Sequence, residues 1–330
     1  MTYWPLTLLV SFIIPVIALP LFIKYLKKHN MGQKIRQEGP DLHQHKMGTP
    51  TMGGVIVILT LVIIVLLLVP YNKYVLWSLV ATVGFGLIGL IDDLIKYLKK
   101  RSLGLLTMQK LSLQIVFALI VAYCVQQNTD LGTEICLPFF KNSINLGRMF
   151  IPFVVLVLVS SVNAVNLTDG LDGLAAGLII IAILSFALIA YVQNILPMSL
   201  FSLIVAFASF GFLIYNFYPA RIFLGDVGSL ALGGALASVS IFTRTELFLL
   251  IIGGVFAIET LSVILQVVSV KLRGKIIFKM SPIHHHFELC GWKEPKIIIR
   301  FWIAGIIPVS YTHLRAHETV LDLVCRLLLE

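Results

Sequence analysis

Long apolar segments recur along almost the whole chain, and each approaches the length of a helix that crosses a bilayer. They lie near residues 3–23, 51–69, 74–91, 107–125, 150–166, 173–192, 198–216, 226–243 and 246–270, and an incomplete tenth begins at residue 297. Lipid offers the backbone no hydrogen-bond partners, so such segments fold as helices that satisfy their own amide and carbonyl groups. The sequence therefore predicts an all-α polytopic membrane protein of about ten transmembrane helices.

The composition excludes a soluble fold. Of the 330 residues, 58% are hydrophobic and 12% are charged, and the mean hydropathy is +0.98, which is more apolar surface than a globular core can bury. The first segment is too long for the core of a signal peptide and no basic stretch precedes it, so we expect it to remain as a span. The four cysteines stand singly, which indicates neither a disulfide framework nor a zinc site.

Basic residues are distributed unevenly between alternate connectors. Connectors 24–50, 92–106 and 271–296 are rich in Lys and Arg, whereas connectors 70–73 and 126–149 carry few. Because short cytoplasmic loops carry an excess of basic residues, we expect the rich connectors on the cytoplasmic side. This pattern predicts an extracytoplasmic N-terminus and a multi-pass protein of the cytoplasmic membrane.

Polar side chains gather at the segment ends on the predicted cytoplasmic side. Asp92 and Asp93 end one segment, Asp226 opens another, the loop 163–173 (NAVNLTDGLDG) joins two more, and residues 284–286 are three histidines. Crossing a bilayer does not require this chemistry, and the opposite side carries no comparable cluster. We therefore expect one cytoplasmic active site that joins a soluble substrate to a lipid. No pattern indicates a nucleic-acid partner.

Five sequence motifs occur in one order over residues 1 to about 308. They are GTPTMGG at 48–54, DDLIK at 92–96, the loop 163–173, the stretch from Asn216 through FLGDVGS at 223–229, and SPIHHHFE at 281–288. In these motifs the chain resembles the bacterial phospho-N-acetylmuramoyl-pentapeptide transferases (the MraY family). The wider superfamily of polyprenyl-phosphate N-acetylhexosamine-1-phosphate transferases shares the aspartate motifs, whereas the HHHFE run resembles the muramoyl-peptide branch.

The resemblance implies a reaction. Phospho-MurNAc-pentapeptide would pass from UDP-MurNAc-pentapeptide to undecaprenyl phosphate, giving lipid I and UMP for peptidoglycan synthesis in the bacterial inner membrane, with Mg²⁺ as the cofactor. Whether transfer occurs in one step or through a covalent intermediate stays open. A homodimer is compatible with these observations, which do not address the oligomeric state.

The resemblance also implies roles for individual residues. Asp92 would orient or deprotonate the lipid phosphate, with Asp93 beside it near the metal, Asp226 would be the principal Mg²⁺ ligand, and His284 would be catalytic or contact a phosphate. Asn216, Phe223 and Asp172 would contact the uridine, Lys46 would face the diphosphate, and His285 and His286 would lie around the sugar phosphate. The full set of implied substrate-binding residues is Lys46, Asn166, Asp169, Gly170, Leu171, Asp172, Asn216, Phe223, His285 and His286.

Each motif also has a purely structural interpretation. Asp92 could form an i,i+4 ion pair with Lys96 at a helix end, Asp226 could cap a helix N-terminus, and the aspartates of loop 163–173 could form turns. Adjacent histidines point in different directions, unlike the converging histidines of a transition-metal site. Glu259, inside the ninth segment, is interpreted as a structural hydrogen-bonding residue where that helix bends.

Three other interpretations compete with this one: a related enzyme, a transporter and a non-catalytic scaffold. A related transferase that uses UDP-GlcNAc would share the aspartates but is disfavoured by the triple histidine. An ion-coupled transporter would place its carboxylates near the bilayer midplane, often in repeated halves, whereas here they lie at segment ends without a repeat. A non-catalytic scaffold would leave the aspartates unexplained.

The end of the chain departs from the family pattern. After Ile307 the stretch VSYTHLRAHET at 309–319 places polar and ionisable residues where an apolar segment should continue. We therefore assign residues 1–308 to the membrane transferase domain and expect residues 309–330 to be foreign to its fold. The last apolar segment, about 11 residues long, is too short to cross a bilayer alone.

Overall fold

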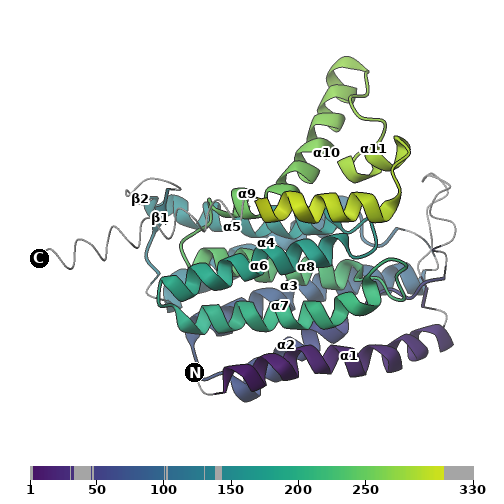
Figure 1. The fold of residues 1–330 in the computed structure, drawn as a ribbon. Coiled ribbons are helices and arrows are strands. Elements are labelled where there is room, and N and C mark those ends of the chain that lie inside the picture. The colour runs from purple at the N-terminus through teal and green to yellow at the C-terminus, as the bar shows by residue number, and fades with distance from the viewer. Residues whose placement is uncertain are drawn as a thin grey trace, which may run out of the picture.

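The computed structural model describes residues 3–29, 31–32, 46, 48–99, 101, 103–129, 131–137 and 143–307. These residues form a bundle of helices with a small hairpin at one end (Figure 1). The helices are α1 (Trp4–Lys28), α2 (Gly54–Leu68), α3 (Lys73–Leu98), α4 (Thr107–Asn128), α5 (Phe150–Thr168), α6 (Leu174–Val192), α7 (Leu196–Asn216), α8 (Gly225–Phe242), α9 (Leu249–Ile252), α10 (Gly254–Arg273) and α11 (Ile283–Leu289), followed by a helix over 294–307. Strands β1 (Glu134–Cys136) and β2 (Ser143–Asn145) pair antiparallel.

Eight of the described helices are long and apolar enough to cross a membrane. The prediction of an all-α polytopic membrane protein is therefore confirmed, whereas the number of crossings and their orientation stay predictions. Helix α2 is shorter, with 15 residues. The proposed tail 309–330 lies outside the described residues, so its separate origin also stays a prediction.

The expected ninth span, 246–270, differs most from the structure. It divides at Gly253 into the single turn α9 and the long helix α10. Two adjacent glycines, Gly253 and Gly254, carry no side chains to hold one helical axis across the break. Beyond them α10 leaves the bundle at an angle and α11 lies beside it (Figure 1). The bend was expected in this span, and it lies before Glu259.

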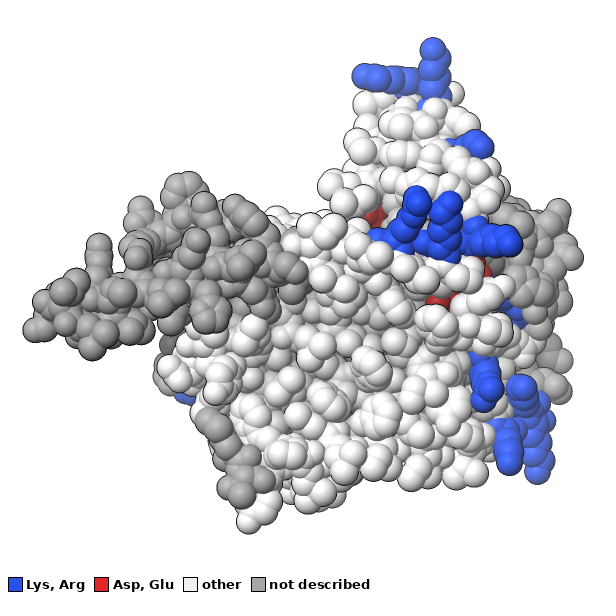
Figure 2. Space-filling view, viewed as in Figure 1, with Lys and Arg blue, Asp and Glu red and all other residues white. Residues whose placement is uncertain are grey.

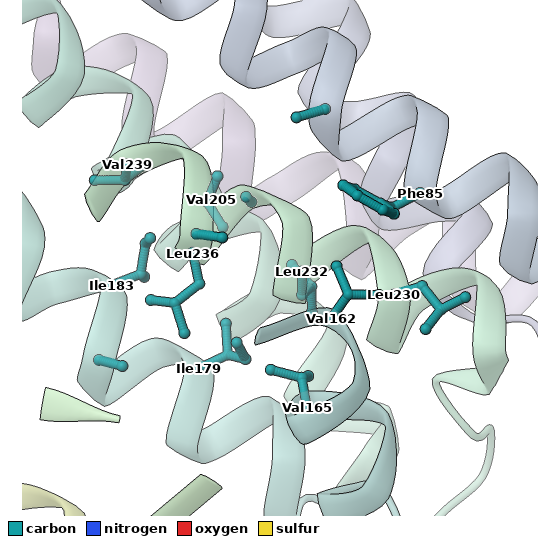
Figure 3. Packing of buried hydrophobic residues seen from close by; sticks show 14 of the residues in the cluster. Phe85, Val162, Val165, Ile179, Ile183, Val205, Leu230, Leu232, Leu236 and Val239 are labelled. Atoms are coloured by element: carbon teal, nitrogen blue, oxygen red, sulfur yellow. The ribbon is translucent and has the colours of Figure 1, made fainter. Parts of the chain in front are cut away.

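Helix α8 forms the centre of the bundle, buried along almost its whole length and packed against α3 and α5 (Figure 3). It is rich in Gly, Ala and Ser, which let helix backbones approach closely in lipid. A Cβ atom on Gly54 of α2 would lie 2.1 Å from the Cα atom of Gly228 in α8. On another face, Ser161 of α5 donates a hydrogen bond of 3.0 Å to the carbonyl of Gly233. Close packing of this kind holds the first half of α8 in place against α2 and α5.

Lys and Arg side chains gather at one end of the bundle and on the far end of α10 (Figure 2). The hairpin and the start of α1 lie at the opposite end (Figure 1). Among the described residues, the basic side chains that gather at one end of the bundle are therefore separated from the hairpin, as the alternation along the chain requires.

This separation predicts the outcome of cysteine labelling. In a background without native cysteines, Lys99→Cys should resist an impermeant thiol reagent added to intact cells, whereas Tyr71→Cys and Ser143→Cys should react. All three side chains are exposed, so differences in reactivity should report the membrane side. Permeabilised cells provide the control, because Lys99→Cys should then react as well. If Lys99→Cys were the only one of the three variants to react in intact cells, the true topology would be the inverse of the predicted one.

Candidate active site

Three carboxylates from two helices converge at the basic end of the bundle. Asp92 and Asp93 lie near the end of α3, Asp226 lies in the first turn of α8, and one oxygen from each lies within 4.8 Å of the others. Asp92 and Asp93 are buried and Asp226 is partly exposed. The predicted aspartate motifs, which are 130 or more residues apart in the chain, thus form one acidic cluster.

Glycines bring the two helices into this contact. A Cβ atom on Gly89, one turn before Asp93 in α3, would lie 2.2 Å from the backbone oxygen of Asp226. Gly225 adopts a φ of +77°, a left-handed conformation that other residues rarely take, and starts α8 beside the Asp93 carboxylate. The sequence FLGDVGS therefore turns the chain sharply so that Asp226 meets α3.

Two lysines offset the negative charge of the cluster. Lys96 Nζ lies 2.7 Å from Asp92 Oδ2, 2.7 Å from Asp226 Oδ2 and 3.4 Å from Asp93 Oδ1. Lys110 of α4 lies 2.8 Å from the same Asp226 oxygen. The i,i+4 pair considered from the sequence thus exists, but Lys96 is shared among all three aspartates. Lys110 was not identified as a site residue from the sequence, although a lone lysine in the first turn of an apolar helix was a usable signal.

Neighbouring donors fix the orientation of each aspartate. The amide of Leu105 donates to Asp92 Oδ1 at 2.7 Å and the amide of Val227 donates to Asp93 Oδ2 at 3.1 Å. Asn166 Nδ2 donates to Asp226 Oδ1 at 2.9 Å. Asp226 lies in the first turn of α8 and not at its N-cap position, which is Leu224, and its carboxylate oxygens contact Lys96, Lys110 and Asn166.

A second group of predicted residues lies around Asp172. Lys46 Nζ donates to Asp172 Oδ1 at 2.7 Å and to Glu294 Oε1 at 2.6 Å. Burial lowers the pKa of Lys46, but the charges of Glu294 and Asp172 outweigh it and raise the pKa above its ordinary value. Asp172 Oδ2 also accepts a hydrogen bond of 2.9 Å from the amide of Ala220. Glu294 was not expected from the sequence, because nothing near it in the chain marks it as a partner of Lys46.

Asn216 joins this group to the residues before α8. Its Oδ1 accepts from the amide of Gly173 at 3.1 Å and its Nδ2 donates to the carbonyl of Ile222 at 2.9 Å. The next residue, Phe223, is partly buried, and its backbone is hydrogen-bonded to Pro50 and Gly53. The motifs GTPTMGG, NAVNLTDGLDG and FLGDVGS are therefore tied together by backbone and amide hydrogen bonds.

Asp169 and its neighbours connect the two groups. The pKa of Asp169 is raised to about 8 by burial and by the negative charges of Asp226 and Asp93. Leu171 is buried and Gly170 is exposed. Burial is the larger cause, and the added effect of Asp226 and Asp93 reflects how close Asp169 lies to the acidic cluster.

The three histidines point in different directions, as predicted. His284 is fully buried, with Nδ1 3.1 Å from a carboxylate oxygen of Glu259. His285 Nδ1 lies 2.7 Å from Glu288 Oε2, and His286 Nδ1 accepts from the amide of Lys279 at 3.2 Å. His284 is placed against loop 163–173, because a Cβ atom on Gly170 would lie 2.3 Å from its Nε2 atom.

The fold and the site together define the class of protein as a membrane-embedded transferase. In this class apolar helices carry carboxylates and lysines at their ends. Residues 75–244, which contain the acidic cluster, match the model of glycosyl transferase family 4. This stretch begins in α3 and ends after α8, and so it covers the two helices that carry the three aspartates.

Full-length relatives specify the branch of this family. The chain is 50% identical over 306 residues to the phospho-N-acetylmuramoyl-pentapeptide-transferase of Halalkalibacterium halodurans, covering 92% of this chain and 94% of that protein. It is 48% identical to the enzymes of the same name from Caldanaerobacter subterraneus and a Geobacillus species, covering 91% and 92% of this chain and 94% of each relative. The chain belongs to the family of phospho-N-acetylmuramoyl-pentapeptide transferases.

Proposed function

We propose that this protein transfers phospho-MurNAc-pentapeptide from UDP-MurNAc-pentapeptide to undecaprenyl phosphate in the bacterial cytoplasmic membrane, giving lipid I and UMP. Membership of the family supports the reaction. The observation that carries the proposal is the acidic cluster of Asp92, Asp93 and Asp226 beneath Lys96 and Lys110. Such a cluster at helix ends can meet a soluble nucleotide substrate and a lipid phosphate together.

We further propose that the acidic cluster holds Mg²⁺. Carboxylate oxygens from three residues are the hard ligands that Mg²⁺ prefers, with phosphate oxygens and water completing its coordination. Asp226 is the most exposed of the three and would be the principal ligand. When bound, the ion would screen the negative charge of the diphosphate and stabilise the departing UMP phosphate.

The residues of the chain itself would bring two anions together. Lys96 and Lys110 offset the charge of the phosphates, and the fixed orientation of Asp92 directs the lipid phosphate. A phosphate monoester has a second pKa near 6, so the acceptor is mostly dianionic at neutral pH. Asp92 is therefore needed to orient the nucleophile more than to deprotonate it.

The group around Asp172 is proposed to bind the UDP half of the donor. Asn216 accepts a hydrogen bond from the amide of Gly173, the residue after Asp172, and Asp172 accepts one from the amide of Ala220, so Asp172 and Asn216 lie close together. Phe223 provides an aromatic face for a planar base. Lys46 would exchange its contact with Glu294 for a phosphate oxygen of the diphosphate. Asp169, Gly170 and Leu171 would contact the substrate between this group and the acidic cluster, and His285 and His286 would lie around the sugar phosphate.

The decisive experiment measures UMP release in detergent with undecaprenyl phosphate and Mg²⁺. UDP-MurNAc-pentapeptide should be turned over, whereas UDP-GlcNAc should not. Omission of undecaprenyl phosphate should stop release, which separates transfer from hydrolysis. Turnover of UDP-GlcNAc alone would instead place the protein in the N-acetylglucosamine branch of the superfamily.

A division of the site into nucleotide and muramoyl halves predicts different effects on UMP inhibition. Loss of base stacking costs roughly 1–3 kcal/mol, so Phe223→Ala should raise the UMP inhibition constant by about one to two decades and weaken the full substrate in parallel. His285→Ala and His286→Ala should impair the full substrate with little change in UMP inhibition. If the histidine variants lose UMP as strongly as Phe223→Ala, the 281–288 segment belongs to the nucleotide pocket.

A further inference from the structure

Glu259 and His284 form a buried pair that the roles assigned so far do not explain. Glu259 lies in α10 and His284 in α11, and both side chains are 0% exposed. His284 Nδ1 lies 3.1 Å from Glu259 Oε2. Within the described residues, neither carboxylate oxygen of Glu259 has a hydrogen-bond partner. The imidazole is thus the group on hand to neutralise this carboxylate.

A buried carboxylate without a counter-charge is strongly unfavourable. His284 Nδ1 also completes no hydrogen bond within the described residues, and a small rotation of the ring would let its N–H donate to the Glu259 carboxylate and relieve part of that cost. Carboxylate–imidazole pairs of this kind set which ring nitrogen carries the proton and hold the ring in one orientation. The sequence predicts a structural hydrogen bond for Glu259, and its position against His284 gives Glu259 a more specific role.

The other ring nitrogen of His284 is directed toward loop 163–173. His284 Nε2 has no hydrogen-bond partner in the described part of the chain, although it is buried. It lies against Gly170, where a Cβ atom would approach to 2.3 Å, so the absence of a side chain at Gly170 makes room for the ring. Asp169 precedes this glycine, and the ring of His285 lies 4.2 Å from that of His284 between centroids.

We propose that Glu259 is a positioning residue for the transfer reaction. It holds the His284 ring in one orientation, with Nδ1 toward its own carboxylate, so that Nε2 is kept beside Gly170, where a phosphate of the donor substrate would be bound. The inference rests on the proposed function, because it assigns the phosphate that His284 meets to the nucleotide sugar. Glu259 would thus act through the orientation of His284.

The kinetic test compares Glu259→Gln with His284→Gln and the double variant, using the full chain in detergent. Glu259→Gln should lower kcat about 10- to 100-fold, the range for loss of a residue that orients a functional histidine, with little change in the inhibition constant of UMP. The same substitution should have little further effect in the His284→Gln background. Thr260→Val, one residue along α10, is the matched control and should retain full activity, because the Thr260 hydroxyl donates to the Phe256 carbonyl of its own helix.

A spectroscopic test does not depend on turnover. Solid-state ¹⁵N NMR of histidine-labelled protein in bilayers should show ring-nitrogen signals of His284, identified by their loss in His284→Gln, that shift in Glu259→Gln. Should Glu259→Gln fail to yield monodisperse protein, Glu259→Asp should give a smaller shift of the same signals with an intermediate kcat. The proposal is overturned if Glu259→Gln retains kcat within about twofold, if its loss is undiminished in the double variant, or if the His284 signals are the same in Glu259→Gln as in the wild type. Absence of UMP release from the wild type would instead refute the proposed function, with the NMR result still deciding the state of the pair.

Discussion

Replacing Asp226 with asparagine is expected to lower kcat by about 10³-fold or more, because it removes a charged ligand from the site where the phosphates would be neutralised. The substitution leaves the hydrogen bond from Asn166 geometrically feasible but weakens the attraction for Lys96, Lys110 and a divalent ion. Radiolabelled donor and thin-layer separation of lipid I would measure the residual rate. Glu134→Gln, on the exposed hairpin, is the control carboxylate and should retain normal activity.

The comparison with Asp92→Asn separates two roles. Raised Mg²⁺ or Mn²⁺ should restore part of the activity of Asp226→Asn, since its defect is in metal affinity. Asp92→Asn should be similarly inactive but should not respond to metal, because its defect is in the orientation of the lipid phosphate. Equal rescue of both variants, or of neither, would show that Asp226 and Asp92 do not have the separate roles of metal binding and phosphate orientation.

The second large effect is expected from Gly89→Ala in α3. A Cβ atom there would lie 2.2 Å from the oxygen and 2.4 Å from the carbonyl carbon of Asp226, both of them backbone atoms. Because backbone cannot rotate away like a side chain, α3 and α8 must separate, at a cost of about 1–3 kcal/mol for overpacking. A shift of 1 Å in a catalytic geometry can reduce a rate about 10²-fold, so activity should fall more than stability.

Measurements of kcat and of the thermal unfolding midpoint in detergent test this prediction. Gly254→Ala is the matched control, because the space around a Cβ atom on Gly254 is open and alanine favours the helix. It should preserve activity and not lower the midpoint. Normal kcat in Gly89→Ala would mean that α3 and α8 can approach differently without disturbing the aspartates.

The helical fold could be predicted from the sequence because lipid allows few alternatives to it. Apolar segments of span length must satisfy their own backbone, so their positions near α3, α5 and α8 follow from hydropathy. The break at Gly253 was harder to place, because an apolar segment remains apolar on both sides of a bend. The direction in which α10 leaves the bundle depends on packing, which no local pattern records.

The residues of the acidic cluster could also be predicted, since carboxylates are conspicuous at the ends of apolar segments. Their partners were less accessible. Lys110 meets Asp226 across 116 residues of chain, and Lys46 meets Glu294 across 248. In the sequence, Lys46 is one of many cytoplasmic lysines and Glu294 is one residue of a polar connector. Nothing distinguishes them as site residues until the fold brings them together. The partnership of Glu259 and His284 was hidden for the same reason.

The shared position of Lys96 affects what happens between catalytic cycles. Three carboxylates crowded within 4.8 Å would repel one another whenever a divalent ion departed with its product. The ammonium group of Lys96, in contact with all three, serves as a tethered counter-ion that cannot diffuse away. An incoming ion would therefore displace the Lys96 ammonium group from the carboxylates. The three aspartates would keep their arrangement while ions and substrates bind and leave.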